Sequence, residues 1–207
     1  MVCVDFDGTI TDLDTFDHLV VTCASEDAWR YYECQLTRGT MSVRDALDAQ
    51  ARLIRGTVDD VDRLLVQSVR FDPTFASFVR RCRSRDIALV VLSSGIGELI
   101  RRAMVRNDLA EVEVRANEAD PSPQGWTMRF ADESDNGHDK AAAVRAFQRD
   151  GARVVFVGDG ISDFDAALAA DVRFARAGRS LERFLKKKNV GFTSFSSFAQ
   201  IERALFA

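Results

Sequence analysis

The chain has 207 residues, 46% of them hydrophobic and 29% charged, a balance typical of a globular protein with room for one domain and a large insert. Its formal net charge of −4 excludes the basic surface by which proteins hold nucleic acid, so no nucleic-acid partner is expected. No apolar run reaches the ~18 residues of a membrane helix, and a strand is predicted at the first residues, so we expect neither a membrane partner nor a signal peptide.

The first predicted element is a short buried strand over residues 2–6, followed by a turn from Gly8 to Asp14. Asp5 and Asp7 end this strand and point to the same side if the chain stays extended. The carboxyl ends of parallel strands are where ligands bind in open sheets. A carboxylate at such a position can attack phosphorus, so Asp5 is a candidate nucleophile. Asp7 beside it is a candidate for proton transfer. The hydroxyl of Thr9 is expected to hold Asp7.

Residues 15–67 show helical patterns and no strand, which predicts a separate helical module. Ser25, Ser42 and Thr57 are placed to begin helices, and Gly56 is placed to end the second of them. The helix after this module is expected to start at Pro73, because proline is favourable in the first helical turn.

A second buried strand is predicted over residues 87–92, followed by a helix over 96–106. Ser93, Ser94 and Gly95 lie between them. A serine hydroxyl and backbone N–H groups at the start of a helix suit a phosphate oxygen, so Ser93 is a candidate phosphate ligand. The alternative is that this serine only caps the helix.

The remaining pattern alternates between strands and helices, which indicates a parallel α/β sheet. A hairpin joins the strand around residues 112–114 to the one around 126–130. The other expected elements are helices over 139–149, 162–170 and 180–188, strands over 153–157 and 172–175, and a final β-α pair. The basic run of residues 186–188 is expected to be the solvated end of a helix.

A second acidic pair, Asp159 and Asp163, follows the strand over 153–157. Together with Asp5 and Asp7 it places four carboxylates at strand ends, where they stay ionised only around a cation. Oxygen ligands beside phosphate favour Mg2+. Lys140 could neutralise both a phosphate and Asp5.

Histidine and cysteine suggest no further chemistry. The two histidines, His18 and His138, have no visible partner, and a loop role is favoured for His138 over acid-base chemistry. A zinc site is not expected, because histidine and cysteine do not cluster. The four cysteines lack CxxC spacing and are expected to be reduced, with Cys3 buried, in a cytoplasmic protein.

With these residues the sequence resembles the haloacid dehalogenase superfamily of phosphatases. The four motifs of that family are matched, in order, by Asp5-Phe6-Asp7-Gly8-Thr9, by Ser93, by Lys140 and by Gly158-Asp159-Gly160-Ile161-Ser162-Asp163. The resemblance implies a Rossmann-like α/β core with a parallel sheet, formed by residues 1–14 and 73–207. An α-helical cap of the C1 type, residues 15–72, would be inserted into it.

The resemblance also implies roles for individual residues. Asp5 would be the nucleophile and Asp7 the general acid and base, while Lys140 and Ser93 would bind the phosphoryl group. Mg2+ would be held by Asp5, the backbone carbonyl of Asp7 and Asp159, with Asp163 beside it. The full set of expected substrate-binding residues is Thr9, Asp14, Gln50, Ser93, Ser94 and Gly95.

Within the superfamily the chain resembles the phosphoserine phosphatase-like branch. It is most similar there to the methionine-salvage phosphatases acting on 2-hydroxy-3-keto-5-methylthiopentenyl-1-phosphate. The similar stretches are residues 5–11, 117–118, 172–176 and 190–195. Phosphoserine phosphatases carry glutamate where this chain has Asp14 and an arginine of the cap where it has Gln50.

The expected partner is therefore a small phosphorylated metabolite. The candidate selecting residues, Asp14, Phe16, His18 and Gln50, offer no arginine for a carboxylate, which favours a neutral or cationic ester. The salvage intermediate, phosphocholine and phosphoethanolamine fit this description. Phosphoserine hydrolysis, phosphoryl transfer and a non-catalytic metabolite-binding module stay open, as does the oligomeric state. Asp14 could equally serve only to cap a helix.

Overall fold

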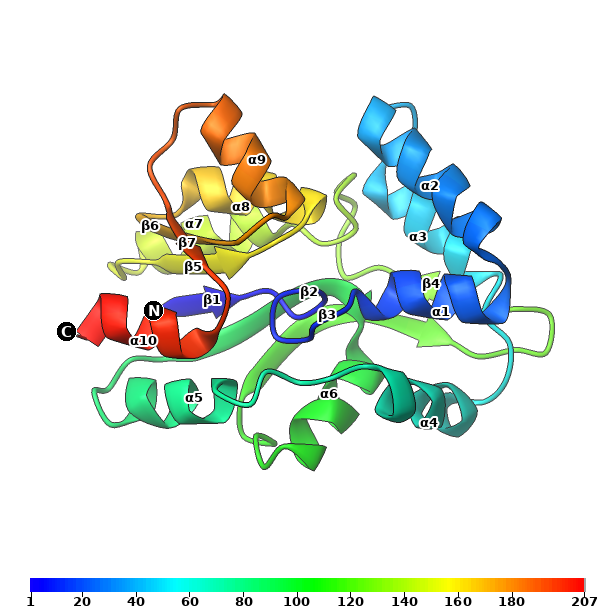
Figure 1. The fold of residues 1–207 in the computed structure, drawn as a ribbon, viewed down its shortest axis with the longest axis horizontal. Helices are drawn as coiled ribbons and strands as arrows, with labels where there is room; N and C mark the ends of the chain where they lie inside the picture. The colour runs from blue at the N-terminus through cyan, green and yellow to red at the C-terminus, as the bar shows by residue number, and fades with distance from the viewer. Residues whose placement is uncertain (207) are drawn as a thin grey trace.

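Seven strands form one sheet in the computed structural model, which describes residues 1–206 (Figure 1). The strands are β1 (Val2–Val4), β2 (Leu89–Ile96), β3 (Glu113–Asp120), β4 (Thr127–Arg129), β5 (Val155–Gly158), β6 (Val172–Arg176) and β7 (Thr193–Phe195). Their order is β4-β3-β2-β1-β5-β6-β7, and every pairing is parallel except that of β3 with β4. The predicted α/β class with a Rossmann-like parallel sheet is therefore confirmed.

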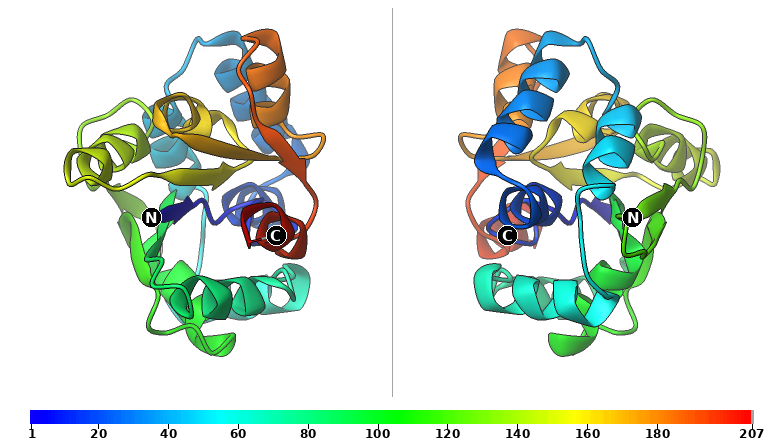
Figure 2. Two further views of the ribbon diagram at one scale, coloured as in Figure 1. Left: turned by 90° about the vertical axis from the view of Figure 1, so that its left-hand side faces the viewer. Right: turned by 90° about the vertical axis from the view of Figure 1, so that its right-hand side faces the viewer.

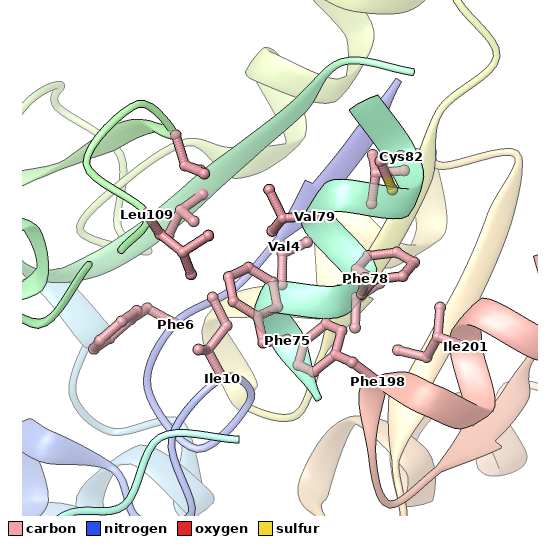
Figure 3. Close-up of a cluster of buried hydrophobic side chains, with 14 of the residues drawn as sticks. Val4, Phe6, Ile10, Phe75, Phe78, Val79, Cys82, Leu109, Phe198 and Ile201 are labelled. Carbon is pink, nitrogen blue, oxygen red and sulfur yellow. The ribbon is translucent and has the colours of Figure 1, made fainter. Parts of the chain in front are cut away.

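Helices cover both faces of the sheet (Figures 1 and 2). On one face lie α5 (Phe75–Arg83), α6 (Gly97–Arg106) and α10 (Phe198–Phe206), and on the other lie α7 (Lys140–Arg149), α8 (Phe164–Ala169) and α9 (Ser180–Lys187). Figure 3 shows the first layer, in which Val4 of β1 lies among aromatic residues of α5 and α10. Cys3 points to the opposite layer, as expected from the period of two. Its burial raises the pKa of the thiol to about 12.

Four helices fill the chain between β1 and α5, and we refer to them together as the helical insert. They are α1 (Thr15–Cys23), α2 (Glu26–Arg38), α3 (Val43–Ala51) and α4 (Val58–Ser68). The side chains of Asp14, Ser25, Ser42 and Thr57 each accept a backbone N–H of the helix that follows. The three predicted helix starts are therefore confirmed. The two chain crossings between insert and core run side by side, because a β-bridge joins Thr11 to Phe71.

The insert shares a hydrophobic core with the hairpin of β3 and β4. The indole N–H of Trp126 donates to the carbonyl of Gly56 at 3.0 Å. On the other side, Arg102 and Arg106 of α6 form ion pairs with Asp59 and Asp62 of α4. These contacts fix α3 and α4 against the rest of the protein. In contrast, α2 contains no buried residue and packs on α1 and α3.

Several predicted boundaries were wrong. Helix α3 ends at Ala51 instead of reaching Gly56. Helix α5 begins at Phe75, since the backbone N–H of Thr74 is bound by the Asp72 side chain and Pro73 stays in the preceding turn. Strand β2 continues to Ile96, so the segment from Ser93 to Gly95 is extended and does not begin a helix. Within residues 1–206, none of the helices combines the length and the apolar character of a membrane span.

Candidate active site

Carboxylates gather where the adjacent strands β1 and β5 end. Asp5 directly follows β1, and its backbone N–H donates to the carbonyl of Val157 in β5 at 2.9 Å. Asp159 directly follows β5. From β1 the strand order runs outward through β2 and β3 to β4, and from β5 it runs outward on the other side through β6 to β7. Open α/β sheets bind ligands at the point where the order changes direction, which here lies between β1 and β5. Both carboxylates are nevertheless buried, so their charge requires compensation.

Lys140 supplies part of this compensation. It is the first residue of α7 and is 1% exposed, and its Nζ lies 2.6 Å from Asp5 Oδ1 and 2.7 Å from Asp163 Oδ1. Burial opposes the charge of Lys140, but the two carboxylates outweigh burial and raise the pKa of its ammonium. The pKa of Asp5 is raised well above its usual range by burial and by the charge of Asp163, against the effect of Lys140. Lys140 therefore stays protonated beside the candidate nucleophile.

Asp163 holds this arrangement in place through hydrogen bonds. Its Oδ2 accepts the backbone N–H groups of Asp159 and Gly160 at 2.9 and 3.0 Å, while its Oδ1 receives Lys140. Both of its oxygen atoms are thus occupied. Asp163 orients Lys140 and the loop after β5 at the same time.

The residues present fit a hard divalent cation. Carboxylate oxygens of Asp5, Asp159 and Asp163 lie within 4.8 Å of one another, and all three residues are buried. No hydrogen bond within residues 1–206 uses Asp5 Oδ2 or Asp159 Oδ2, and the nearest cation to Asp159 Oδ2 is the guanidinium of Arg179 at 4.0 Å, so both oxygens can accept a metal ion. Burial and the charge of Asp163 raise the pKa of Asp159 to about 7. A cation between the two free oxygens would keep both groups ionised.

Gly8 and Thr9 shape the Asp159 side of this site. Gly8 has a φ of +70°, and a Cβ there would lie 2.5 Å from Asp159 Oδ2. The turn directs Thr9 toward β5, where its hydroxyl donates to Asp159 Oδ1 at 3.2 Å. The expectation that Thr9 holds Asp7 was therefore wrong. Thr9 is fully buried and does not line the cleft described below, so it supports Asp159.

Asp7 is held from two sides by other hydroxyls. Thr15, at the start of α1, donates to Asp7 Oδ1, and Ser93 of β2 donates to Asp7 Oδ2 at 3.1 Å. Burial raises the pKa of Asp7, while these two hydrogen bonds lower it. Ser93 also accepts the N–H of Gly95 at 2.9 Å and does not line the cleft. The structure thus places the Ser93 hydroxyl on Asp7.

Replacing Gly95 by alanine is expected to displace Asp7. A Cβ at Gly95 would lie 2.5 Å from Asp7 Oδ2 and 3.1 Å from the Ser93 hydroxyl, and both side chains are confined. If Asp7 transfers a proton as predicted, kcat for a phosphate ester should fall about 100-fold, because a shift of about 1 Å in a reacting group can cost this much. Gly191→Ala is the matched control, since a Cβ there meets no atom within 4 Å. Equal kcat values for the two variants would contradict this role of Gly95.

A cleft of about 370 Å³ opens above these residues, between the core and the helical insert. Asp5, Asp7 and Asp159 form its floor, and the predicted residues Asp14, Phe16, Gln50, Ser94 and Gly95 also line it. His18 does not, contrary to its prediction as a selecting residue. Asp14 caps α1 by accepting the N–H of Asp17 at 2.9 Å, and it also lines the cleft, so its contact with a substrate stays a prediction.

The outer part of the cleft contains charged residues that sequence reasoning missed. Asp17 and Glu33 line it from α1 and α2, Arg183 lines it from α9, and Arg179 lines it from the position just before α9. The predicted selecting residues included no arginine, whereas the cleft itself contains two. Both guanidinium groups bind backbone carbonyls, Arg179 that of Asp12 at 3.0 Å and Arg183 that of Gly178 at 2.6 Å. Their positions at the start of a helix that follows a strand of the parallel sheet are the signal that could have revealed them.

Two further polar residues lie next to the residues of the site. The amide of Asn117 in β3 donates to the carbonyl of Ser94 at 2.8 Å and accepts the N–H of Ala131 at 2.9 Å. It thus ties the cleft segment of β2 to the chain after the hairpin. His138 lies in the loop before α7, as predicted, and burial and the charge of Lys140 lower the pKa of its imidazole.

Comparisons with known proteins agree with this geometry. Residues 2–168 match the haloacid dehalogenase-like hydrolase family. The chain is 31% identical to Pdp3-interacting factor 1 of Schizosaccharomyces pombe, over 97% of this chain and 92% of that protein. It is 28% identical to polyol phosphate phosphatase PYP1 of Saccharomyces cerevisiae, over 97% and 90% of the two chains. A 2-hydroxy-3-keto-5-methylthiopentenyl-1-phosphate phosphatase of Brevibacillus brevis is 26% identical, over 97% and 92%. A substrate-bound phosphoserine phosphatase structure shares the fold, with a TM-score of 0.76 at 16% identity over 98% and 96% of the chains.

Proposed function

The chain belongs to the haloacid dehalogenase-like hydrolase family, and on this premise we propose that it is a Mg2+-dependent phosphomonoester hydrolase with Asp5 as its nucleophile. One observation carries the proposal. Asp5, at the end of β1, is buried between Lys140 and the carboxylate of Asp159, at the floor of an open cleft. This arrangement supplies a nucleophile, a fixed positive charge and an oxygen site for a cation at one place.

The proposed reaction has two steps. A carboxylate oxygen of Asp5 attacks phosphorus, the bond from phosphorus to the ester oxygen breaks, and Asp7 gives its proton to the departing oxygen. Asp7 then takes a proton from water, whose oxygen attacks the phosphorus of the aspartyl-phosphate and releases inorganic phosphate and Asp5. Thr15 and Ser93 keep Asp7 oriented throughout both steps.

Charge neutralisation comes from both sides of Asp5. Lys140 offsets the charge of Asp5 and of the phosphoryl group. Asp5 and Asp159 would hold Mg2+, together with the backbone carbonyl of Asp7 expected from the family, and Asp163 would brace this set. When bound, Mg2+ would reduce the repulsion between the carboxylates and the incoming phosphate. Ser94 and Gly95, which line the cleft, are the proposed contacts of the phosphoryl oxygens.

We assign the helical insert, with its flanking residues over 15–72, to a cap that covers the leaving group, and residues 1–14 and 73–207 to the catalytic core. The cleft lies between these two parts, so residues of the insert select the ester. The substrates named for the relatives are a polyol phosphate and the methionine-salvage intermediate, and either would fit a cleft of this size. Phosphoserine is less suited, since the arginines of the cleft already bind backbone carbonyls.

Chelation of divalent cations is expected to abolish hydrolysis of p-nitrophenyl phosphate, and added Mg2+ is expected to restore it. The Asp159→Asn variant should require at least about ten times more Mg2+ for half-maximal activity. Loss of a residue that only hydrogen-bonds to a metal ligand already weakens metal binding about tenfold or more, and loss of a direct ligand should weaken it at least as much. Glu111→Asn, an exposed acid far from the cleft, serves as the control. Activity that persists in chelator would refute the metal-dependent mechanism. Tight binding of phosphate esters without any hydrolysis would favour a binding module instead.

A further inference from the structure

Two carboxylates of the insert face the cleft without forming an ion pair. Asp17 of α1 and Glu33 of α2 both line it, and neither forms an ion pair within residues 1–206. Burial raises the pKa of Asp17 to about 6; the charges of Glu33 and Asp7 act in the same direction, and Trp29 and the charge of Arg179 act against it. Two neighbouring acids with incomplete solvation have acceptor oxygens available for a ligand.

Unpartnered polar groups lie on the same wall. Gln50 of α3 is only 4% exposed and lines the cleft, and its amide makes no hydrogen bond within residues 1–206. The indole N–H of Trp29 is buried without a hydrogen-bond partner; it is close enough to Asp17 to lower the pKa of that carboxyl, yet it does not reach hydrogen-bonding geometry. A buried N–H that the protein leaves unpaired is costly unless a ligand pairs with it, and the Gln50 amide is free to bind a ligand in the cleft.

The spacing along α2 places these groups over the leaving group. Trp29, Glu33 and Leu36 are separated by four and three residues, so they share one face of the helix, and all three line the cleft. Figure 1 shows α2 and α9 standing on the same side of the sheet, and the cleft lined by this face of α2 is also lined by Arg179 and Arg183 at the start of α9.

The charges of the two walls decide which ligand fits. The outer cleft contains the carboxylates of Asp14, Asp17 and Glu33 against the guanidinium groups of Arg179 and Arg183. With this near balance, a full positive charge on the ligand gains little, whereas neutral hydroxyl groups can donate to the free carboxylate oxygens. A carboxylate on the leaving group gains little for the same reason, because the acids of α1 and α2 offset the two arginines.

We propose that Asp17, Glu33 and Gln50 form a specificity subsite that binds the hydroxyl groups of polyol-like leaving groups. This assignment rests on the proposed phosphatase function and adds residues to it. It differs from the expectation for Asp14, because one oxygen of Asp14 is already occupied in capping α1.

The test compares the wild-type protein with the double variant Asp17→Asn/Glu33→Gln, which preserves side-chain size. For each ester, kcat/KM is divided by the value for p-nitrophenyl phosphate, whose leaving group has no hydroxyl donor. We expect the ratios for glycerol 3-phosphate and sorbitol 6-phosphate to fall at least about tenfold in the variant, as hydrogen bonds to charged groups are lost. Asp27→Asn on the exposed side of α2 should keep the wild-type ratios.

The other outcomes are also informative. Unchanged polyol ratios in the double variant would overturn the proposal, and so would a loss confined to phosphocholine, which would indicate recognition of a cation. If the wild-type protein hydrolyses no ester at all, the proposed function fails independently. The subsite is then tested by calorimetry, where the affinity for sorbitol 6-phosphate relative to inorganic phosphate should still fall in the double variant. An equal relative affinity would refute it.

Discussion

An Asp5→Asn variant is expected to lose at least about 10⁴-fold in kcat for every phosphate ester, in line with the loss of other catalytic nucleophiles. The amide oxygen of asparagine is a poor nucleophile and carries no charge to help hold a cation. The variant should nevertheless fold, because the amide can still accept from Lys140 and because Lys140 keeps its ion pair with Asp163. Activity and thermal unfolding measured on the same preparation check both parts.

The matched control for this change is Asp108→Asn. Asp108 is an exposed residue with a φ of +58°, a conformation that asparagine tolerates well. It should retain the kcat and the melting temperature of the wild-type protein. Near wild-type turnover by Asp5→Asn would mean that another group attacks phosphorus. If the variant fails to fold, the detection of a phosphoryl group on Asp5, described at the end of the Discussion, decides the question.

Replacing Lys140 by methionine is expected to affect both catalysis and stability. Methionine has a similar length without the charge, so Asp5 and Asp163 would lose their shared partner while staying buried. Breaking a buried pair of this kind costs about 3 kcal/mol or more in the free energy of unfolding. The transition state would also lose a fixed positive charge, which should lower kcat about 10³-fold.

Denaturant unfolding and steady-state kinetics measure these two losses. Lys187→Met, at an exposed position of α9, controls for the general effect of removing a lysine and should change neither quantity. A Lys140→Met protein as stable as the control would show that the carboxylates do not depend on this ion pair for their burial. One that retained full activity would remove Lys140 from the proposed mechanism.

The inner part of the site was accessible from the sequence because its signals are local. Asp5 and Asp159 each follow a short apolar run that forms a buried strand, and the order of a parallel sheet brings the ends of such strands together. Lys140 was recognisable by its place at the start of a helix before β5. The expected α/β fold followed from the alternation of elements.

The hydroxyl groups that bind the carboxylates of the site were harder to predict, because their directions depend on small displacements of the backbone. The positive φ of Gly8 turns Thr9 toward Asp159, and the extension of β2 to Ile96 points Ser93 at Asp7. The outer wall of the cleft could not be predicted at all. Glu33 and Arg183 are far apart in sequence, and they line one cleft only because the packing of α2 and α9 places them there.

Direct detection of a phosphoryl group on Asp5 tests the central claim most directly. The Asp7→Asn variant should still react with p-nitrophenyl phosphate, whose leaving group needs no proton, but it should hydrolyse the aspartyl-phosphate slowly because no base activates water. After acid quenching and digestion, mass spectrometry should find the mass of one phosphoryl group on the peptide containing Asp5. The Asp5→Asn/Asp7→Asn double variant should show none. A phosphoryl group on another residue, or a burst of p-nitrophenol without any covalent adduct on Asp5, would contradict the proposed mechanism.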